Sequence, residues 1–356
     1  MENSLYKRNY SLDIVRIIAV LAVVMIHSSA SFVMNNPLNT NEFIFGNLFD
    51  SLSRIGVPLF LMISGALFLD KNKEVTLKTI LSKNIKNLAI IIITWSIIYS
   101  VVFEVLLAPS MGKTVDVRSI IDGLINCTYQ NGSYHMWYLY MIVGLYIITP
   151  FLKKFVCKDN KEMVLFFIII SFCLQFFTPV INAIDKLGLN LSFINIWIDK
   201  FYLDFFGGYI TYFLVGWYIV HIGIKRKWHR CIIYFLGAVS LISIVFYVHF
   251  TGDYNNAYAD IGAPVFLYSV SVFLALNTIN WNLKEKTAKK IVELSKLTFG
   301  VYIVHAMLIT IYSLIFPYNK YSALYILVCF VVVVFCSLLI SYSISKIPVL
   351  KKIVKA

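Results

Sequence analysis

The sequence predicts an all-α integral membrane protein with about ten transmembrane helices and both termini in the cytoplasm. Apolar residues make up 60% of the 356 residues and charged residues only 14%, which is far from the balance of a soluble domain. Apolar stretches long enough to cross the hydrocarbon core of a bilayer recur along the whole chain. Lys and Arg are concentrated in alternate segments between these stretches. We therefore expect a single transmembrane domain over residues 1–356.

Each predicted span is an apolar run of about 20 residues bounded by polar segments. The ten runs are about 11–31, 47–69, 87–107, 134–152, 163–181, 205–224, 231–250, 263–281, 297–316 and 322–345. The longest loops between them hold about two dozen residues, which is fewer than a separate soluble domain needs.

Basic residues predict the orientation of these spans. When the N-terminus is placed inside, 24 of the 31 Lys and Arg residues fall in internal segments and 5 in external ones. Such an excess on one side is the positive-inside pattern, and it places both termini in the cytoplasm. The net charge of +13 therefore reflects topology, and no nucleic-acid partner is expected. Only Cys127 of the six cysteines lies in an external loop, and no pair of cysteines has metal-ligand spacing, so no metal is expected.

The first span carries two ionisable residues, Arg16 and His27, which are rare inside bilayers and mark functional sites by default. They are eleven positions apart, so they project from one face of a helix and are separated by about 16 Å along its axis. Asp13 lies one turn before Arg16 and can pair with it. The alternative is structural: Arg16 anchors the helix at the membrane surface and His27 forms a hydrogen bond to a neighbouring helix.

The second span places Arg54 about two turns from its outer end, which is too deep for its charge to reach the surface comfortably. Asp50 is one turn away and Glu104 ends the third span at similar depth, so either carboxylate could be its partner. Pro58 and Gly65 would loosen this helix and allow close packing.

Spans four and nine supply further polar side chains. Span nine carries a polar stripe at helical spacing, made of Ser295, Thr298, Tyr302, His305 and Tyr312. Such stripes usually hold helices together, although His305 near mid-depth also suits the wall of a pocket. His135 and Trp137 open span four within an aromatic cluster, which is either a membrane-surface belt or a site for stacking on a sugar ring.

The internal loop before span three places Lys83 and Lys86 one turn apart at the membrane surface. Positive-inside topology by itself predicts lysines here. The functional alternative is a rim that binds the phosphates of a nucleotide-type donor.

Four segments in order resemble acyltransferase family 3, whose members are integral-membrane enzymes that acylate extracytoplasmic carbohydrates. They are "LDIVRIIAVLAVVMIH", "SRIGVPLFLMISGALFL", "HMWYLYMIVGLYIITPFL" and "FGVYIVHAML". The most specific element is an arginine and a histidine separated by ten residues, matched here by Arg16 and His27. The family often has two arginines three apart before span three, and Lys83 and Lys86 keep the charge at those positions. No esterase-like C-terminal domain is expected after span ten.

The resemblance implies an O-acetyltransferase type of enzyme with acetyl-CoA, or another acyl-CoA, as donor substrate and no permanently bound cofactor. His27 would act as a general base or carry the acyl group, Arg54 would stabilise the oxyanion, and Arg16 would contact the donor with Lys83 and Lys86. The remaining pocket positions would bind the acceptor or line its site: Asp13, Glu104, His135, Trp137, Tyr302 and His305. The implied partners are acyl-CoA, a carbohydrate acceptor and the lipid bilayer, with a homo-oligomer or a separate envelope-side protein as further options.

Two alternatives remain at this point. A transporter or exporter of polysaccharide would also carry Arg and His inside the membrane, although no pair of broken spans recurs in the two halves. A structural subunit of a glycan-assembly complex would leave the histidines without a purpose. The expected location is the cell membrane, with a bacterial cytoplasmic membrane favoured.

Overall fold

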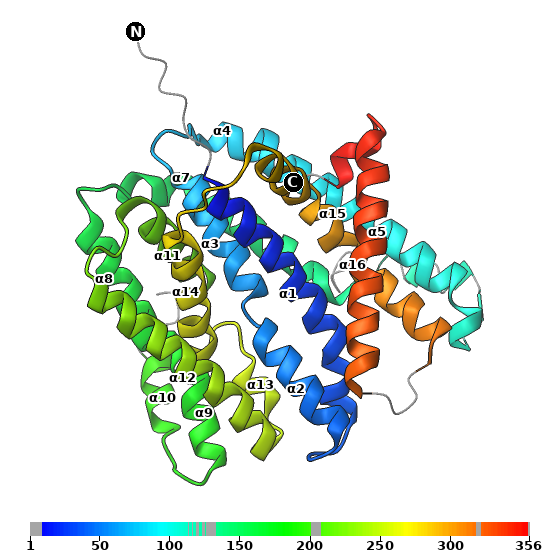
Figure 1. The fold of residues 1–356 in the computed structure, drawn as a ribbon, viewed down its shortest axis with the longest axis horizontal. Helices are drawn as coiled ribbons and strands as arrows, with labels where there is room; N and C mark the ends of the chain where they lie inside the picture. The colour runs from blue at the N-terminus through cyan, green and yellow to red at the C-terminus, as the bar shows by residue number, and fades with distance from the viewer. Residues whose placement is uncertain are drawn as a thin grey trace. The chain divides into compact units, whose positions relative to one another are not determined.

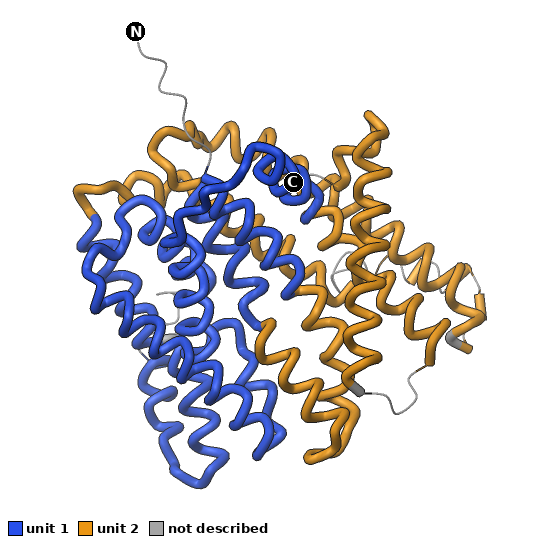
Figure 2. The backbone as a smooth tube through the Cα atoms, in the orientation of Figure 1, with its two compact units in different colours: residues 1–22, 54–67, 161–298 blue, residues 23–53, 68–160, 299–356 orange. Residues whose placement is uncertain are grey.

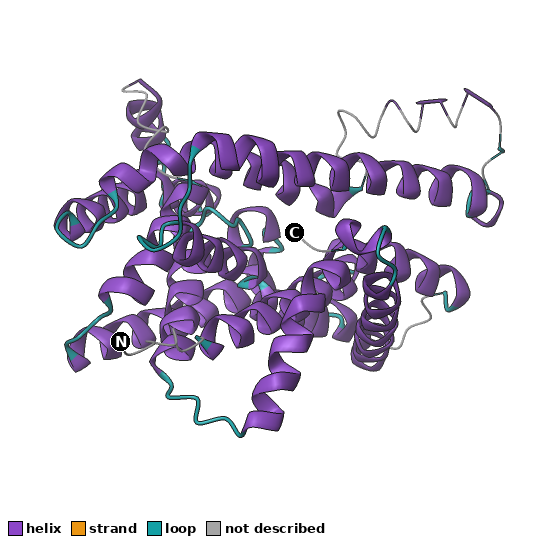
Figure 3. Cartoon of the chain, turned by 90° about the horizontal axis from the view of Figure 1, so that it is seen from above, coloured by secondary structure: helices purple, strands orange, loops and turns teal. Residues whose placement is uncertain are grey.

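The computed structural model describes residues 9–112, 114–115, 117–118, 121–122, 125, 133–200, 208–317 and 322–354. Every regular element within these ranges is helical (Figures 1 and 3). The all-α prediction is therefore confirmed. The physical reason is that a helix satisfies its backbone hydrogen bonds within one segment, which is what a long apolar stretch requires in lipid.

The first half of the chain forms helices up to residue 200. They are α1 (Tyr10–Asn35), α2 (Asn41–Ser53), α3 (Gly56–Phe68), α4 (Leu77–Thr79), η1 (Ile80–Ile85), α5 (Lys86–Val101), η2 (Val102–Leu106), η3 (Pro109–Met111), η4 (Tyr134–Met136), α7 (Trp137–Phe155), α8 (Lys161–Ser171), η5 (Phe172–Phe176), α9 (Thr178–Lys186) and α10 (Phe193–Lys200).

The second half continues in the same way. Its helices are α11 (Tyr209–Trp217), η7 (Tyr218–Ile222), α12 (Lys227–Thr251), α13 (Tyr254–Ala257), α14 (Ala263–Thr278), α15 (Glu285–Ile315), α16 (Ser322–Lys346) and η8 (Leu350–Ile353). Each of the ten predicted spans thus contains a helix.

Eight helical segments within the described ranges are long and apolar enough to cross a membrane. Two further apolar segments, Tyr209–Ile222 and Ala263–Thr278, are shorter than a full crossing normally needs. These two coincide with the predicted spans 205–224 and 263–281. The chain is a multi-pass membrane protein, and the count of ten spans and the position of the termini stay predictions.

The second predicted span is two helices rather than one. α2 ends at Ser53 and α3 begins at Gly56, so Arg54 and Ile55 lie in a turn between them. Pro58 supplies the reason, because it has no N–H to donate to the carbonyl of Arg54 and its ring clashes with that carbonyl. The break sets the backbone of Arg54 outside regular helix.

The helix of the ninth span begins earlier than its apolar run. α15 starts at Glu285, twelve positions before the predicted edge at residue 297. The added residues are mostly strong helix formers, and an ion pair between Glu285 and Lys289, with 2.6 Å between Nζ and Oε1, supports the first turn. Hydropathy detects only the part of a helix that crosses the apolar layer.

The described helices group into two compact units, coloured in Figure 2. Unit 1 comprises residues 1–22, 54–67 and 161–298, and unit 2 comprises residues 23–53, 68–160 and 299–356. Neither unit is one continuous stretch of chain, because α1 and α15 each contribute residues to both. The single transmembrane domain over residues 1–356 stays a prediction.

Glycines allow helices of unit 1 to approach very closely. A Cβ atom added at Gly65 of α3 would lie 1.8 Å from the Phe213 carbonyl oxygen, and one added at Gly216 of α11 would lie 1.9 Å from that of Met62. The two glycines therefore face each other's helices, as small residues commonly do in membrane helix packing. The predicted close packing at Gly65 is confirmed.

The predicted topology leads to a labelling experiment in a cysteine-free background. We expect a cysteine at position 225, in an exposed loop, to react with a membrane-impermeant thiol reagent only after the cells are opened, because its lysine-rich segment is predicted to stay inside. Equivalent cysteines within 71–78 and 284–290 should behave in the same way. A cysteine at the exposed position 190 is the external control. Strong labelling of position 225 in intact cells would contradict the orientation.

Candidate functional site

Three histidines from distant parts of the chain meet in unit 2. His27 comes from α1, His135 from η4 and His305 from α15. The rings of His27 and His305 are stacked with centroids 5.3 Å apart, and the ring of His135 meets His305 edge-on at 5.0 Å. We call His27, His135 and His305 the histidine cluster.

Two members of the histidine cluster are fully enclosed. His305 is 0% exposed and His135 is 2% exposed, whereas His27 is half-buried. His305 Nδ1 donates a hydrogen bond to the backbone carbonyl of Tyr302, and His135 Nδ1 lies 3.1 Å from Ser133 Oγ. The other ring nitrogen, Nε2, of both His135 and His305 is buried and has no hydrogen-bond partner within the described part of the chain.

Tyrosines hold the histidine cluster in place. Tyr99 of α5 donates its hydroxyl proton to the Ile303 carbonyl at 2.9 Å, and its ring lies 5.3 Å from that of His135. Tyr302 donates to the His135 carbonyl at 2.5 Å. The first bond ties α5 to α15 and the second ties α15 to η4, so the histidine rings have little freedom to move.

The histidine cluster reaches the surface of unit 2 beside His27. Tyr134 packs edge-on against His27 with ring centroids 4.8 Å apart, and it is 54% exposed. Trp137 begins α7 as a half-buried residue next to Tyr138, whose ring lies 5.7 Å from that of Tyr302. The open side of the cluster is therefore aromatic.

Arg16 is held by two groups of unit 1. Its Nη1 donates to Ser295 Oγ of α15 at 3.1 Å and lies 3.8 Å from Asp13 Oδ1. The Asp13 side chain is only 5% exposed and that of Arg16 is 29% exposed. The predicted pairing of Asp13 with Arg16 is confirmed, and Ser295 is a partner that the sequence did not indicate.

Arg54 packs against an aromatic ring. Its guanidinium carbon lies 4.1 Å from the centroid of the Tyr258 ring, which is a cation–π contact within unit 1. Burial raises the pKa of the neighbouring Asp260 carboxyl to about 6, and the positive charge of Arg54 acts in the opposite direction. The pairing of Arg54 with Asp50 or with the half-buried Glu104 stays a prediction.

Three lysines of unit 2 lie close enough to interact with one another. Lys73 has a pKa below its ordinary value, first because it is partly buried and then because the positive charges of Lys153 and Lys83 act on it. Lys153 Nζ donates to the backbone carbonyls of Asp70, at 2.7 Å, and of Lys73. We call Lys73, Lys83 and Lys153 the lysine cluster.

Of the two lysines that were predicted to bind the donor substrate, only Lys83 belongs to the lysine cluster. Lys83 and Lys86 are both exposed, Lys83 in the π-helical segment η1 and Lys86 at the start of α5. π-Helical turns are often found at functional sites. Sequence reasoning missed Lys153, because a lysine at the inner end of span four is already explained by topology.

The histidine and lysine clusters lie at opposite ends of the same two helical segments of unit 2. Along η1 and α5, Lys83 and Tyr99 are 16 positions apart, and along η4 and α7, His135 and Lys153 are 18 positions apart. At the rise of an α-helix these spacings correspond to about 24 and 27 Å, close to the thickness of the hydrocarbon core. Since α5 and α7 contact each other, the two clusters are joined by an antiparallel helix pair.

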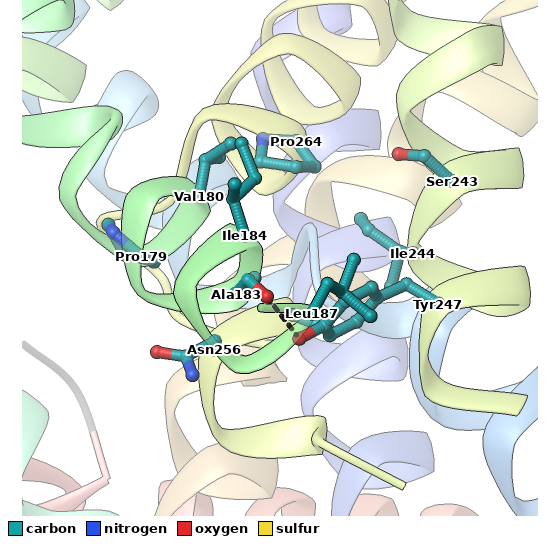
Figure 4. A pocket seen from close by; sticks show the side chains of 11 residues that line it. Pro179, Val180, Ala183, Ile184, Leu187, Ser243, Ile244, Tyr247, Asn256 and Pro264 are labelled. Carbon is teal, nitrogen blue, oxygen red and sulfur yellow. Dashed lines mark hydrogen bonds between the residues drawn. The ribbon is translucent and has the colours of Figure 1, made fainter. Parts of the chain in front are cut away.

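A separate cavity lies in unit 1, with a volume of about 190 Å³ (Figure 4). Its walls are mainly apolar side chains of α9, α12, α13 and α14, and none of the predicted site residues lines it. At its edge, Tyr247 bonds the Ala183 carbonyl and, at 3.0 Å, Asp253 Oδ2. Burial acts to raise the pKa of Asp253, but hydrogen bonds from Asn256, Lys186 and Tyr247 hold it below its ordinary value. The cavity therefore offers mainly apolar volume, with the polar side chains of Ser243, Tyr247 and Asn256 in its wall.

Comparison with known families gives one match. The model of acyltransferase family 3, described as an acyltransferase domain, matches residues 9–342. No curated protein and no solved structure matches the chain. The matched range includes both clusters and the Arg16 and Arg54 sites.

Proposed function

We propose, since this chain belongs to acyltransferase family 3, that it transfers an acyl group from cytoplasmic acyl-CoA to a hydroxyl of an extracytoplasmic or lipid-linked carbohydrate. Acetyl is the expected acyl group. The observation that carries the proposal is the pair of clusters at opposite ends of α5 and α7. One end offers cations and the other offers imidazoles, and the two are separated by about the thickness of a membrane core.

The lysine cluster suits the phosphate end of the donor. Coenzyme A carries several phosphates, and lysine ammonium groups bind phosphate as point charges. Lys153 is held by two backbone carbonyls, and mutual repulsion among the three lysines would be relieved by an anion. The flexible arm of the donor would then lie along the α5 and α7 pair with its thioester towards the histidine cluster.

The histidine cluster suits the reacting end. His27 is half-buried and borders the exposed Tyr134, so a substrate can reach it from the surface of unit 2. A neutral imidazole can accept the proton of a sugar hydroxyl or attack the thioester and carry the acyl group. His135 and Tyr302 pack around His305, and with Trp137 they would bind the acceptor, because aromatic faces pack well on sugar rings.

The two arginines have preset geometries that suit binding. Arg16 is oriented by Asp13 and Ser295, and its guanidinium would contact the donor. Arg54 is oriented by the Tyr258 ring and would stabilise the oxyanion that forms when the acyl carbonyl is attacked.

The proposed activity can be tested on cells and on purified protein. Envelope glycans from cells with the protein should contain species heavier by one acyl group than those from cells without it, and purified protein in vesicles should transfer label from acyl-CoA. A polysaccharide exporter would instead change the amount of external glycan and leave its mass unchanged. Identical glycan masses together with no transfer of label would overturn the proposal.

The donor site leads to a kinetic prediction. The double variant Lys83→Gln/Lys86→Gln is expected to raise the KM for acyl-CoA about 10-fold, equivalent to about 1.4 kcal/mol, with a smaller effect on kcat. Phosphate contacts remote from the reacting carbon contribute mostly uniform binding. High salt should reproduce the defect in the wild type, because partly exposed charges are screened over about 8–10 Å.

A matched control removes the same charge elsewhere. Lys286→Gln/Lys290→Gln changes two exposed lysines of α15 that lie outside the lysine cluster, and it should leave the donor KM unchanged. Equal donor KM values for the Lys83→Gln/Lys86→Gln variant and the wild type would show that these lysines serve topology alone.

A further inference from the structure

The Nε2 atom of His305 is an exception to the rule that buried polar atoms form hydrogen bonds. The residue is fully buried, and its Nε2 has no hydrogen-bond partner among the residues that the structure describes. Buried polar groups are almost always paired, since an unpaired one costs free energy. An exception inside a cluster of functional residues indicates a place where a substrate atom completes the bonding.

The protonation pattern of His305 follows from its other nitrogen. A backbone carbonyl can only accept, so the Nδ1 that bonds the Tyr302 carbonyl must carry the proton. In the neutral ring Nε2 therefore presents a lone pair. A histidine whose Nδ1–H is held by an acceptor and whose Nε2 is free has the arrangement of a general base.

The same reasoning does not apply to His135. Its Nδ1 lies beside the hydroxyl of Ser133, which can donate or accept, so either tautomer is compatible with that contact. His305 is thus a member of the histidine cluster whose basic nitrogen is set by the fold.

We propose that Nε2 of His305 accepts the proton of the acceptor hydroxyl during acyl transfer, an inference that rests on the proposed function. The hydroxyl oxygen forms a bond to the acyl carbon and the carbon–sulfur bond of the thioester breaks. The hydroxyl proton passes to His305 Nε2 and from there to the departing thiolate, so the ring returns to its neutral state. In this direct transfer His27, stacked on His305 at 5.3 Å, binds the thioester carbonyl group and positions it for attack.

Two isosteric variants separate this role from a structural one. His305→Asn keeps an amide donor near the position of Nδ1 and so preserves the bond to the Tyr302 carbonyl, whereas His305→Gln places its amide near the position of Nε2. Neither amide is basic. Both variants are expected to lose about 10²- to 10⁴-fold in kcat while the KM for acyl-CoA changes less than about 2-fold.

Tyr312→Phe is the matched control, because Tyr312 lies two turns further along α15, is also buried and lies outside the proposed site. It should keep the wild-type kcat. Retention of more than about half of the wild-type kcat by His305→Asn would overturn the inference, because a residue needed for proton transfer cannot be replaced by an amide.

A pH profile tests the role of His305 even if both His305 variants fail to accumulate. In the residual activity of His27→Ala, kcat/KM should still fall at acid pH with the slope of a single proton. A flat profile would overturn the role of His305. Failure of the wild type to transfer any acyl group would instead overturn the proposed function, so the two failures are distinguishable.

Discussion

Replacing His27 with alanine is expected to reduce acyl transfer by about 10²- to 10⁴-fold while the protein still accumulates in the membrane. His27 is the half-buried member of the histidine cluster, and it borders the exposed Tyr134. Its imidazole is therefore the first that an entering acyl group or hydroxyl meets. The rate of label transfer from acyl-CoA by purified protein measures the loss.

His249→Ala provides a matched control for the loss of an imidazole. His249 lies at the end of α12 with similar exposure, and its ring contacts Phe250 of the same helix. We expect this variant to keep wild-type activity. Wild-type rates in His27→Ala, with the acyl group on the same acceptor, would remove His27 from the mechanism.

Replacing Arg16 with alanine is expected to abolish transfer to a similar degree, with a reduction of at least about 10²-fold. The change removes the cation that would contact the donor. It also leaves the Asp13 carboxylate, 5% exposed, without its neighbouring cation, and an uncompensated buried charge is strongly destabilising. Loss of activity could then arise from loss of folded protein.

The double variant Arg16→Ala/Asp13→Asn separates these two effects. Removing the carboxylate charge should restore accumulation of the protein, whereas acyl transfer should remain absent if Arg16 serves the reaction. Recovery of transfer in the double variant would show that Arg16 only neutralises Asp13.

Arg16→Lys adds a test of geometry. A lysine can keep the charge near Asp13, but it lacks the planar fork whose Nη1 contacts Ser295 and Asp13 and which would also contact the donor. Partial activity would show that charge is sufficient, and activity as low as in Arg16→Ala would show that the fork is required. Ser295→Ala, which removes one partner of Arg16, should have a smaller effect than either.

The sequence by itself determined the features that depend on local chemistry. Long apolar runs predicted the helices, because a bilayer requires each segment to satisfy its own backbone. Asp13 and Arg16 were predicted to pair because residues three apart on a helix are neighbours. The helical spacing of Tyr302 and His305 placed both on one stripe of α15, and both are buried.

Only the tertiary structure decided which helix faces pack against one another. The period of a helix shows which side chains share a face, but it says nothing about which helix covers that face. The contacts of Arg54 with Tyr258 and of His27 with His305 join residues more than 200 positions apart. Such contacts are set by how helices pack against one another, and no local pattern of residues encodes that packing.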